Sequence, residues 1–421
     1  MENKNGDNRN HFSSPVVKLS DCFSELVKFT LTSHSHLLNL ETNFCSTLLK
    51  QDNASSSSSY FESFLEGVPQ YPLYNRLASA LLRCMDSQGF CSTGCNIEMM
   101  NNKFENSSMQ QKHNEWQNLI IEKGSEIVNI LKTVSFQLHV QEPFFTQLKD
   151  GLKTIEGRCA SAKYNRIELG NLILLNKSLV FEVQVMLCFI NNWCYCLQCL
   201  FPVSYFINIQ GVRRYPSFFD MLETEGLGKV LPGVESVEEG VKIYRRFYTE
   251  EMEQANGVLA ISVSKLSFQP CTSLASLFSE LSYAGVQGLL GLMHTTGTVP
   301  DALPPPRSTL LASFNFPCNP NEKSLTHGAR ALAKHAGRSS SGYWGSLVGN
   351  DSNKNRLAMD VINNLIAHCC WMNIHIVPPH GVVFEIRVAD GYGARWNEDG
   401  SKFIGFLEPY MQDGHSKGWK H

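Results

Sequence analysis

The chain has 421 residues, with 36 Lys and Arg against 39 Asp and Glu and a formal net charge of -3. This length predicts two or three domains. The near-zero charge excludes a global attraction to nucleic acid or acidic lipid, so any anion-binding surface must be local. The 14 cysteines are irregularly spaced and the N-terminus is polar. We therefore predict reduced thiols, no secretory signal, no membrane segment, and a location in the nucleus or cytoplasm.

The first third of the chain predicts a helical region, residues 17–134, after a polar and disordered tail, residues 1–16. The run DNASSSSS, residues 52–59, predicts a flexible linker, and an Asn-rich stretch follows later. Cys91 and Cys95 have no second pair of ligands nearby, and the histidines show no ligand spacing. We therefore predict neither a metal site nor a cofactor.

A different pattern begins at Ser135 and continues to residue 265. Alternating or β-branched segments predict strands, whereas segments bounded by proline and glycine predict helices. The predicted strands are SFQLHV, KTIEGRC, GNLILLN, LVFEVQ and GVLAISVS, and the predicted helices are PFFTQLKDG, PSFFDMLETEG and SVEEGVKIYRRFYTEEME. This order predicts a mixed, mainly antiparallel sheet with inserted helices.

The remaining residues predict a helix, a linker and a second α+β domain. Residues 266–307 contain an amphipathic helical segment and then four prolines between residues 300 and 306, which predict a linker. Residues 308–421 have the size of an ordinary domain. Its predicted elements are a strand TLLASFNF, the helices LTHGARALAKHAGR and NKNRLAMDVINNLIAHCC, and the strands WMNIHIVP, VVFEIRVADG, GYGARW and SKFIGFLEPY.

The segment GLKTIEGR, Gly151 to Arg158, resembles the signature of the ASCH domain, whose small β-barrel is similar to the PUA fold of RNA-modification proteins. The later helical run resembles the insertion of bacterial-type members. The resemblance covers residues 135–265, and the whole chain is similar to plant proteins described as RNA-binding ASCH-domain proteins. It implies an α+β chain with a PUA-like ASCH barrel, a helical N-terminal region and a separate α+β C-terminal domain. It also implies RNA as the partner.

The polar residues of this motif predict contact with nucleic acid. Basic groups beside the glycine turn suit a phosphate or a base edge, and Glu156 suits a base amino group. The following loop, RCASAKYNR, combines cations with an aromatic ring on which a base can stack. A structural ion pair between Glu156 and Arg158, and a polar loop without a ligand, are the alternatives. The predicted contacts are Lys153, Glu156, Arg158, Lys163, Tyr164 and Arg166.

An enzyme is the alternative to a binding protein. Some ASCH relatives resemble amidohydrolases that act on modified nucleobases, using a lysine and a threonine. The resemblance places Lys153 at the lysine position and Glu156 at the threonine position, while Thr154 lies on the wrong strand face. The hydroxyl nucleophile is thus not in its expected register, so the alternative is a nucleotide- or RNA-directed hydrolase with Lys153 and Glu156 as general acid and base.

A second group of cations lies on the predicted helix LTHGARALAKHAGR. Its basic side chains recur at intervals of 3, 4 and 4 on one face, and no acidic residue occurs from 326 to 350. This stripe predicts phosphate contact, and a solvated helix face is its alternative. An aromatic and a cationic residue from elsewhere in the domain would add stacking and charge. The predicted contacts are His327, Arg330, Lys334, Arg338, Trp344 and Arg395.

The strand segment NIHIVPPHGVVFEIRVADGYGARW concentrates polar groups around a glycine turn. A hydrolytic site assembled from His375, Glu385, Arg387 and Arg395 is a further hypothesis, which no recognised catalytic order supports.

Residues 185–210 stand apart because no charged residue occurs between Glu182 and Arg213. Polar residues interrupt the segment as a membrane span, and its C-x-C-x-x-C run lacks a partner pair for zinc. Its removal would join LVFEVQ to GVRRYPSFF, the strand-to-helix junction that the ASCH resemblance implies. The segment starts with Val, whose codons begin with GT, and ends with Gln, which CAG encodes. We therefore predict a translated intron or splice variant.

Overall fold

A computed structural model describes most of the chain. The described residues are 18–34, 37–52, 66–87, 107–161, 163–184, 211–319, 324–336 and 342–409. Several predictions fall outside them, namely those on the tail 1–16, on residues 53–59 of the Ser-rich linker, on Cys91 and Cys95, on the segment 185–210 and on Arg338. The chain divides into two compact units: unit 1 is Met1–Cys22 with Val128–Pro270, and unit 2 is Phe23–Ile127 with Cys271–His421.

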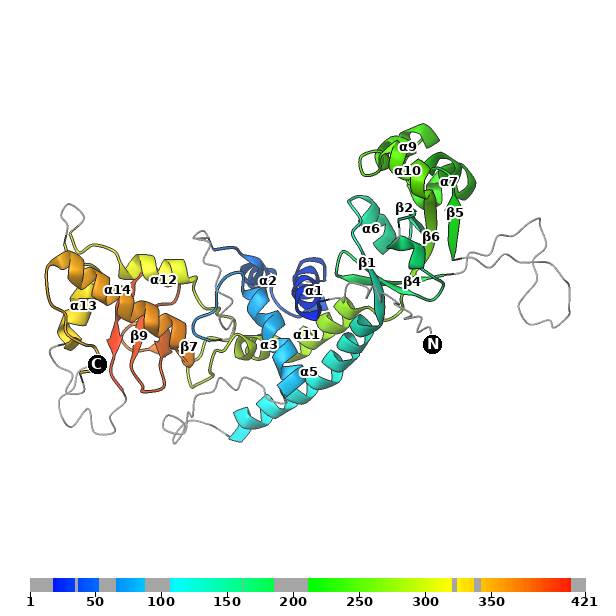
Figure 1. The fold of residues 1–421 in the computed structure, drawn as a ribbon. Coiled ribbons are helices and arrows are strands. Elements are labelled where there is room, and N and C mark those ends of the chain that lie inside the picture. Colours follow the sequence, from blue (N-terminus) through cyan, green and yellow to red (C-terminus); the bar gives the residue numbers. More distant parts are fainter. Residues whose placement is uncertain are drawn as a thin grey trace, which may run out of the picture. The chain divides into compact units, whose positions relative to one another are not determined.

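Unit 1 is built on a six-stranded sheet (Figure 1). Its strands are β1 Val134–Leu138, β2 Ile155–Cys159, β3 Leu172–Leu175, β4 Leu179–Val183, β5 Val212–Tyr215 and β6 Val258–Lys265. The order is β1-β3-β4-β6-β2, with β5 also paired to β6. Only the β1–β3 pair is parallel among these strands. The predicted mixed, mainly antiparallel sheet is therefore confirmed.

The strands β4 and β5 lie end to end along one side of β6. β4 pairs with β6 as far as Val263, and β5 pairs with it from Ile261. Between these, the backbone N–H of Gln184 donates to the Ser262 carbonyl at 3.0 Å, and the Ser262 N–H donates to the Gly211 carbonyl at 2.9 Å. The two residues that flank the segment 185–210 thus meet opposite one residue of β6. Together β4 and β5 form the two halves of one ladder.

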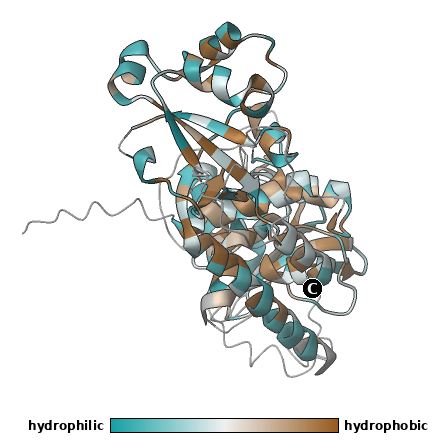
Figure 2. Cartoon of the chain, turned by 90° about the vertical axis from the view of Figure 1, so that its right-hand side faces the viewer, coloured by the Kyte–Doolittle hydropathy of each residue, from teal (hydrophilic) through white to brown (hydrophobic). Residues whose placement is uncertain are grey.

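Short helices cover one end of this sheet. They are α6 Phe144–Lys149, α7 Phe218–Glu225, α8 Leu227–Val230, α9 Val237–Tyr244 and α10 Glu250–Asn256. Their buried sides pack on β2 and β6, where Phe218 stacks on Tyr244 with ring centroids 4.2 Å apart. Hydrophilic residues occupy their outer sides (Figure 2). The chain thereby buries one stripe of each helix, as amphipathic sequences require.

The segment SVEEGVKIYRRFYTEEME forms two helices, and the prediction of one helix was wrong. The helix α9 ends at Tyr244, and α10 begins after Thr249, whose hydroxyl accepts from the Met252 N–H at 3.2 Å. A threonine at this position satisfies a backbone donor of the first turn and so starts a new helix. The break places Phe247 and Tyr248 in a turn between the helices.

Unit 2 contains the predicted helical region. Its helices are α1 Leu19–Ser33, whose first residues belong to unit 1, α2 Thr42–Leu49, α3 Leu73–Ser87, α5 Ser107–Thr133, whose last residues also belong to unit 1, and α11 Pro270–Leu289. The helix α11 bends at Ser282, which has a φ of 57°.

In the proline-rich segment, Pro304 and Pro305 are buried, and the Tyr71 hydroxyl donates to the Pro304 carbonyl at 2.8 Å. No described helix has the length and apolarity that a membrane span needs.

The C-terminal part of unit 2 has its own sheet, so the predicted α+β class is confirmed. Its elements are α12 Arg307–Phe314, α13 His327–Ala336, α14 Asp351–His368, β7 Trp371–Val377, β8 Gly381–Arg387, β9 Gly393–Asn397 and β10 Phe403–Leu407. The four strands are antiparallel in the order β10-β9-β8-β7. One sheet face carries buried apolar residues such as Ile374, Phe384 and Trp396, and polar residues alternate onto the other.

The prediction of a strand for TLLASFNF was wrong, because these residues form most of α12. Leu310 and Phe314 are buried, whereas Phe316 is exposed. Apolar residues four positions apart fit a helix face as well as a strand face, so the spacing could not decide between them.

Candidate functional site

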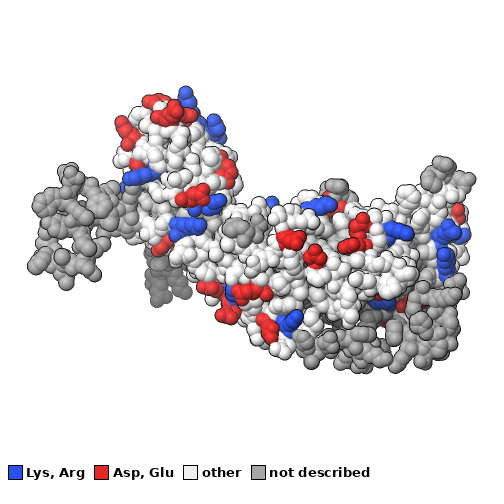
Figure 3. Space-filling model, turned by 180° about the vertical axis from the view of Figure 1, so that it is seen from behind, with Lys and Arg blue, Asp and Glu red and all other residues white. Residues whose placement is uncertain are grey.

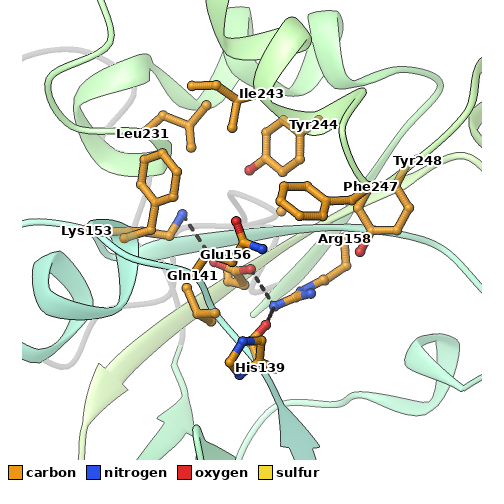
Figure 4. A pocket seen from close by; sticks show the side chains of 13 residues that line it. His139, Gln141, Lys153, Glu156, Arg158, Leu231, Ile243, Tyr244, Phe247 and Tyr248 are labelled. Atoms are coloured by element: carbon orange, nitrogen blue, oxygen red, sulfur yellow. Dashed lines mark hydrogen bonds and ion pairs between the residues drawn. The ribbon is translucent and has the colours of Figure 1, made fainter.

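A cavity of about 260 Å³ lies in unit 1 between β2 and the helices (Figure 4). Three residues of the GLKTIEGR motif, Lys153, Glu156 and Arg158, supply its charged floor. Apolar and aromatic side chains form most of the wall: Phe144, Leu231, Ile243, Tyr244, Phe247 and Tyr248. In Figure 4, Glu156 and Arg158 lie between Leu231 and Ile243 on one side and His139 and Gln141 on the other.

The strand β2 positions Glu156 and Arg158 together. Residues two apart on a strand point to the same face, and here the Arg158 Nη2 lies 2.9 Å from the Glu156 Oε1. Lys153 precedes the strand, just after Gly151 with its φ of 78°. Because it is not bound by the strand alternation, its Nζ reaches the other carboxylate oxygen, Oε2, at 3.2 Å. The structure therefore brings these three charges together.

Lys153 is only 2% exposed and has three acceptors around its ammonium group. The Nζ donates to the Ile155 carbonyl at 2.7 Å and to the Val230 carbonyl, and pairs with Glu156. Burial lowers the pKa of Lys153, while Glu156 acts in the opposite direction. An ammonium has three donors, so these acceptors occupy all of its protons. This arrangement links β2 to the end of α8, and it suits a structural role better than proton transfer.

Arg158 connects the cavity floor to its neighbours. Its Nη2 also donates to the His139 carbonyl at 2.6 Å. Burial acts to lower the pKa of Arg158, but Glu156 and Tyr248 outweigh it, so the pKa is raised and the side chain stays charged. The Arg158 guanidinium and the Lys163 ammonium lie 6.0 Å and 5.6 Å from the centre of the Tyr164 ring. The predicted basic loop thus adjoins the motif, with Lys163 exposed.

The aromatic wall was not predicted from the sequence. The buried Tyr244 hydroxyl lies against Gly157, where any side chain would collide with it and, at 2.8 Å, with the Met221 Cε. Burial and Glu156 together raise the pKa of Tyr244 well above its usual value. Phe247 lines the cavity while remaining 47% exposed, which places its ring at the rim. The sequence did contain a signal for this wall: Thr249 precedes a run of glutamates, as an N-cap residue does. A helix that starts there leaves Phe247 in the connection between α9 and α10.

A second charged cluster lies on the polar face of the C-terminal sheet, in unit 2. Glu385 on β8 is 3% exposed. Its Oε1 accepts from the Arg387 Nε at 2.7 Å, and its Oε2 accepts from the Arg395 Nη2 on β9 at 2.7 Å. The His375 Nε2 on β7 lies 3.4 Å from Oε2. The structure therefore brings together the four residues of the further hydrolase hypothesis, from three strands.

The electrostatics of this cluster keep Glu385 ionised. Burial raises the pKa of its carboxyl, but His375, Arg387 and Arg395 outweigh burial and lower the pKa to about 2. A carboxylate this acidic is a poor proton acceptor near neutral pH. It is well placed to orient the two arginines and the imidazole, whose Nε2 faces it. The other ring nitrogen, Nδ1, is not part of this contact.

The predicted cationic stripe lies on α13. Thr326 caps this helix, with its Oγ1 accepting from the Ala329 N–H at 3.2 Å. His327, Arg330 and Lys334 are all exposed. The two residues expected to extend the stripe are engaged elsewhere. Trp344 is 3% exposed and donates from Nε1 to the Glu408 Oε1 at 2.7 Å, while Arg395 pairs with Glu385.

Charge on the rest of the surface is mixed. On the face shown in Figure 3, both Lys or Arg and Asp or Glu side chains occur over the described residues. Across the described ranges, no group of three or more His, Cys, Asp or Glu side chains could hold a metal ion.

Two families match parts of this chain. Residues 138–267 match the family model of the ASCH domain. The chain contains an ASCH domain. The predicted PUA-like resemblance is thus supported, with the charged cavity inside the matched range. Residues 316–408, which include the Glu385 cluster, match the CdiA C-terminal tRNase toxin domain.

Solved structures are similar to parts of the chain as well. The crystal structure of hypothetical protein PH0355 is 36% identical over 31% of this chain and 98% of its own, with a TM-score of 0.25. Protein PF0455 from Pyrococcus furiosus is 35% identical over 32% and 98%, with a TM-score of 0.23. The toxic C-terminal tip of CdiA from Pseudomonas aeruginosa, in complex with immune protein, is 30% identical over 23% and 99%, with a TM-score of 0.20. No curated protein matches the chain.

Proposed function

We propose that this protein binds RNA, with one base inserted into the ASCH cavity and the α13 stripe in contact with the phosphate backbone. The observation that carries this proposal is the cavity itself, which combines an aromatic rim with a charged floor. Single-stranded RNA is recognised by stacking of splayed bases on aromatic rings and by hydrogen bonds to their edges. The ASCH match supports an RNA-related role for the same residues.

The rim and the neighbouring loop suit an entering strand. Phe247 offers a partly exposed ring, and Lys163 and Arg166 are exposed cations beside Tyr164. Cations of this kind hold phosphates without reading sequence, so they position a strand whose base enters the cavity. On α13, the exposed His327, Arg330 and Lys334 offer a separate line of contact.

RNA binding measured against salt concentration tests this function. We expect the full chain to bind a labelled single-stranded RNA with an affinity that falls steeply as salt rises. Exchange of Arg330 and Lys334 for Ala should reduce the slope of log K against log salt by about 1.4, since each phosphate contact on a single strand contributes about 0.7. Lys132→Ala, which removes an exposed cation elsewhere, is the matched control. Absence of binding at low salt would contradict the proposal.

The C-terminal cluster favours a second function, cleavage of an RNA phosphodiester. Two arginines held by one carboxylate form a positive site for a phosphate, and an imidazole lies beside them. The match of residues 316–408 to a tRNase toxin domain favours the same chemistry. This cluster suits the hydrolase alternative better than the pair Lys153 and Glu156, because the Lys153 protons are occupied.

The chemical step would use groups that the cluster already orients. His375 takes the proton of a ribose 2′-hydroxyl, whose oxygen attacks the adjacent phosphorus while the bond to the 5′-oxygen breaks and that oxygen takes a proton from water, leaving a 2′,3′-cyclic phosphate. Arg387 and Arg395 stabilise the charge that builds up on the phosphoryl oxygens. Glu385 holds all three side chains in place and acts as a positioning residue.

Cleavage of a structured RNA such as tRNA tests this second function. We expect His375→Ala to lower the cleavage rate by about 10²–10⁴, the usual contribution of a general base. His368→Ala, which changes a histidine on α14, should leave the rate unchanged. Equal rates for the wild type and His375→Ala would reject the role of this cluster, even if the ASCH cavity binds RNA.

A further inference from the structure

We propose that the ASCH cavity selects guanine among the four RNA bases. This inference rests on the proposed RNA binding and adds the identity of the base. It follows from the hydrogen-bonding groups that remain on the cavity floor after the internal contacts are counted.

Glu156 retains acceptor capacity on both carboxylate oxygens. A carboxylate has about four lone-pair sites. Lys153 takes one at Oε2 and Arg158 takes one at Oε1. Each oxygen therefore keeps about one site, and two adjacent N–H donors would satisfy them together. The Glu156 side chain is 9% exposed and lines the cavity, so a donor reaches it from there.

Arg158 supplies donors beside these acceptors. A guanidinium has five N–H groups. Its Nη2 contacts the Glu156 carboxylate and donates to the His139 carbonyl. The Arg158 side chain is 15% exposed and lines the cavity, so the guanidinium still presents donor capacity there. Lys153 contributes no donor to a ligand, because its three acceptors are internal.

The floor therefore presents two acceptors next to a donor. On the pairing edge of guanine, the 2-amino group and N1–H are adjacent donors, and O6 is an acceptor beside them. Adenine offers one amino donor and a ring acceptor, cytosine one amino donor and two acceptors, and uracil one donor between two acceptors. Only guanine fills both oxygens of Glu156 and also gives Arg158 an acceptor. Any other base would leave a buried acceptor without a partner, which is costly.

The walls agree with a planar ligand of this size. The cavity volume of about 260 Å³ lies just below the range of about 300–1,000 Å³ of small-molecule sites, which suits a single base. Phe247 at the rim and the rings of Tyr244 and Tyr248 offer flat apolar surfaces on which a purine can stack. The floor carries two cations and one carboxylate, so its net charge attracts the electron-rich O6.

The test uses changes in the RNA, so it does not depend on the folding of a variant. Hexauridine carrying one central guanosine, inosine, 1-methylguanosine, adenosine or cytidine is labelled, and its binding to the full chain is measured by fluorescence anisotropy. We expect guanosine to bind tightest. Inosine lacks the 2-amino group and should bind about tenfold more weakly or worse, since a hydrogen bond to a charged group contributes on this order. Methylation of N1 removes the second donor and should weaken binding at least as much.

A protein variant provides the reciprocal measurement. Glu156→Gln replaces two acceptor oxygens by one oxygen and one amino group. The hexamers with guanosine and with adenosine should then bind with about equal affinity. The control is Glu168→Gln, an exposed change in the same unit that should keep the preference. Circular dichroism verifies that both variants fold; if Glu156→Gln does not, the base series alone decides.

The outcomes separate this inference from the function on which it rests. Binding of all the hexamers with equal affinity would overturn guanine selection while leaving RNA binding intact. Equal affinity for guanosine and inosine would overturn it as well, because the 2-amino group would then not be recognised. If none of the hexamers binds, RNA binding by the cavity fails and the inference fails with it.

Discussion

The two charged clusters of this protein start from the same local sequence and differ in what surrounds it. Glu156-Gly-Arg158 on β2 and Glu385-Ile-Arg387 on β8 each place a glutamate and an arginine on one strand face, where they form an ion pair. In the ASCH domain, the third partner is Lys153, three residues before the glutamate, and the cluster lies at the floor of a cavity. In the C-terminal domain, the partners come from neighbouring strands.

The comparison shows how one motif serves different chemistry. The ammonium of Lys153 donates its protons to acceptors within the protein. The first cluster therefore presents a fixed pattern of acceptors and donors, which suits recognition. The second cluster contains two arginines and a histidine, and its partners are 14–16% exposed. It has a group that can exchange protons and cations that can meet a phosphate, which suits cleavage.

The largest difference between the two clusters is expected when one cation is removed from each and the loss in the free energy of unfolding is compared. Lys153→Met leaves a buried carboxylate with one partner and two carbonyls without a donor, and should cost about 3–5 kcal/mol in the free energy of unfolding. Arg395→Met leaves Glu385 with Arg387 and His375, and should cost only about 1–3 kcal/mol. Hydrogen exchange of peptides from each sheet, measured by mass spectrometry, reports the two losses separately. Equal losses would contradict the structural role of Lys153.

Acid should weaken the second cluster through Glu385. Its pKa of about 2 in the folded chain lies below the ordinary 4.5, so it stabilises the fold above pH 4.5, and this contribution is lost as pH falls toward 2. The shift corresponds to about 3 kcal/mol. Urea unfolding followed by tryptophan fluorescence from pH 6 to pH 2.5 should show this loss. Glu385→Gln should flatten the profile, whereas Asp360→Asn, in an exposed ion pair, should leave it unchanged.

The rim of the cavity should affect binding without affecting stability. Phe247→Ala should weaken RNA binding by about 5- to 150-fold, because stacking of one base contributes about 1–3 kcal/mol. Phe247 is 47% exposed, so the free energy of unfolding should change by about 0.5 kcal/mol or less. Phe219→Ala, a change at an exposed ring on α7 outside the cavity lining, is the matched control. A similar loss of binding in both variants would refute a specific role of the rim.

The smallest effect is expected from removal of residues 185–210. Because Gln184 and Gly211 already meet opposite Ser262, joining them should keep the pairing of β4 and β5 with β6. We expect a change of about 1 kcal/mol or less in stability and unchanged RNA affinity. Hydrogen exchange over β6 and anisotropy with the hexamers provide the measurements, and a Gly/Ser linker of the same length is the control. Loss of protection in β6 would show that the segment is needed, and would count against its origin as a translated intron.

Much of the ASCH domain could be predicted because its signals are local. Alternating or β-branched runs predict the strands, and Gly151 predicts the turn before β2. Thr326 likewise predicts the start of α13. The Arg158 partner Glu156 is two residues away, so the ion pair follows from strand geometry alone.

What the sequence could not decide depends on contacts between distant residues. The link from Lys153 to the Val230 carbonyl joins positions 77 residues apart. The partners His375 and Arg395 of Glu385 depend on the register of three strands, which turns and packing set. In α12, the buried residues Leu310 and Phe314 are four positions apart, a spacing that fits a helix face and a strand face equally well. The helix is therefore decided by tertiary packing.

The continuity of β4 with β5 has a consequence for how the ASCH domain tolerates damage. A strand that is held on both sides of an interruption by the same neighbour does not need its own covalent connection there. Proteolytic cleavage between Gln184 and Gly211 would leave both halves bonded to β6, with the cavity floor on β2 untouched. The domain could then also be produced as two complementing fragments that reassemble around β6, each inactive in RNA binding until the other is added.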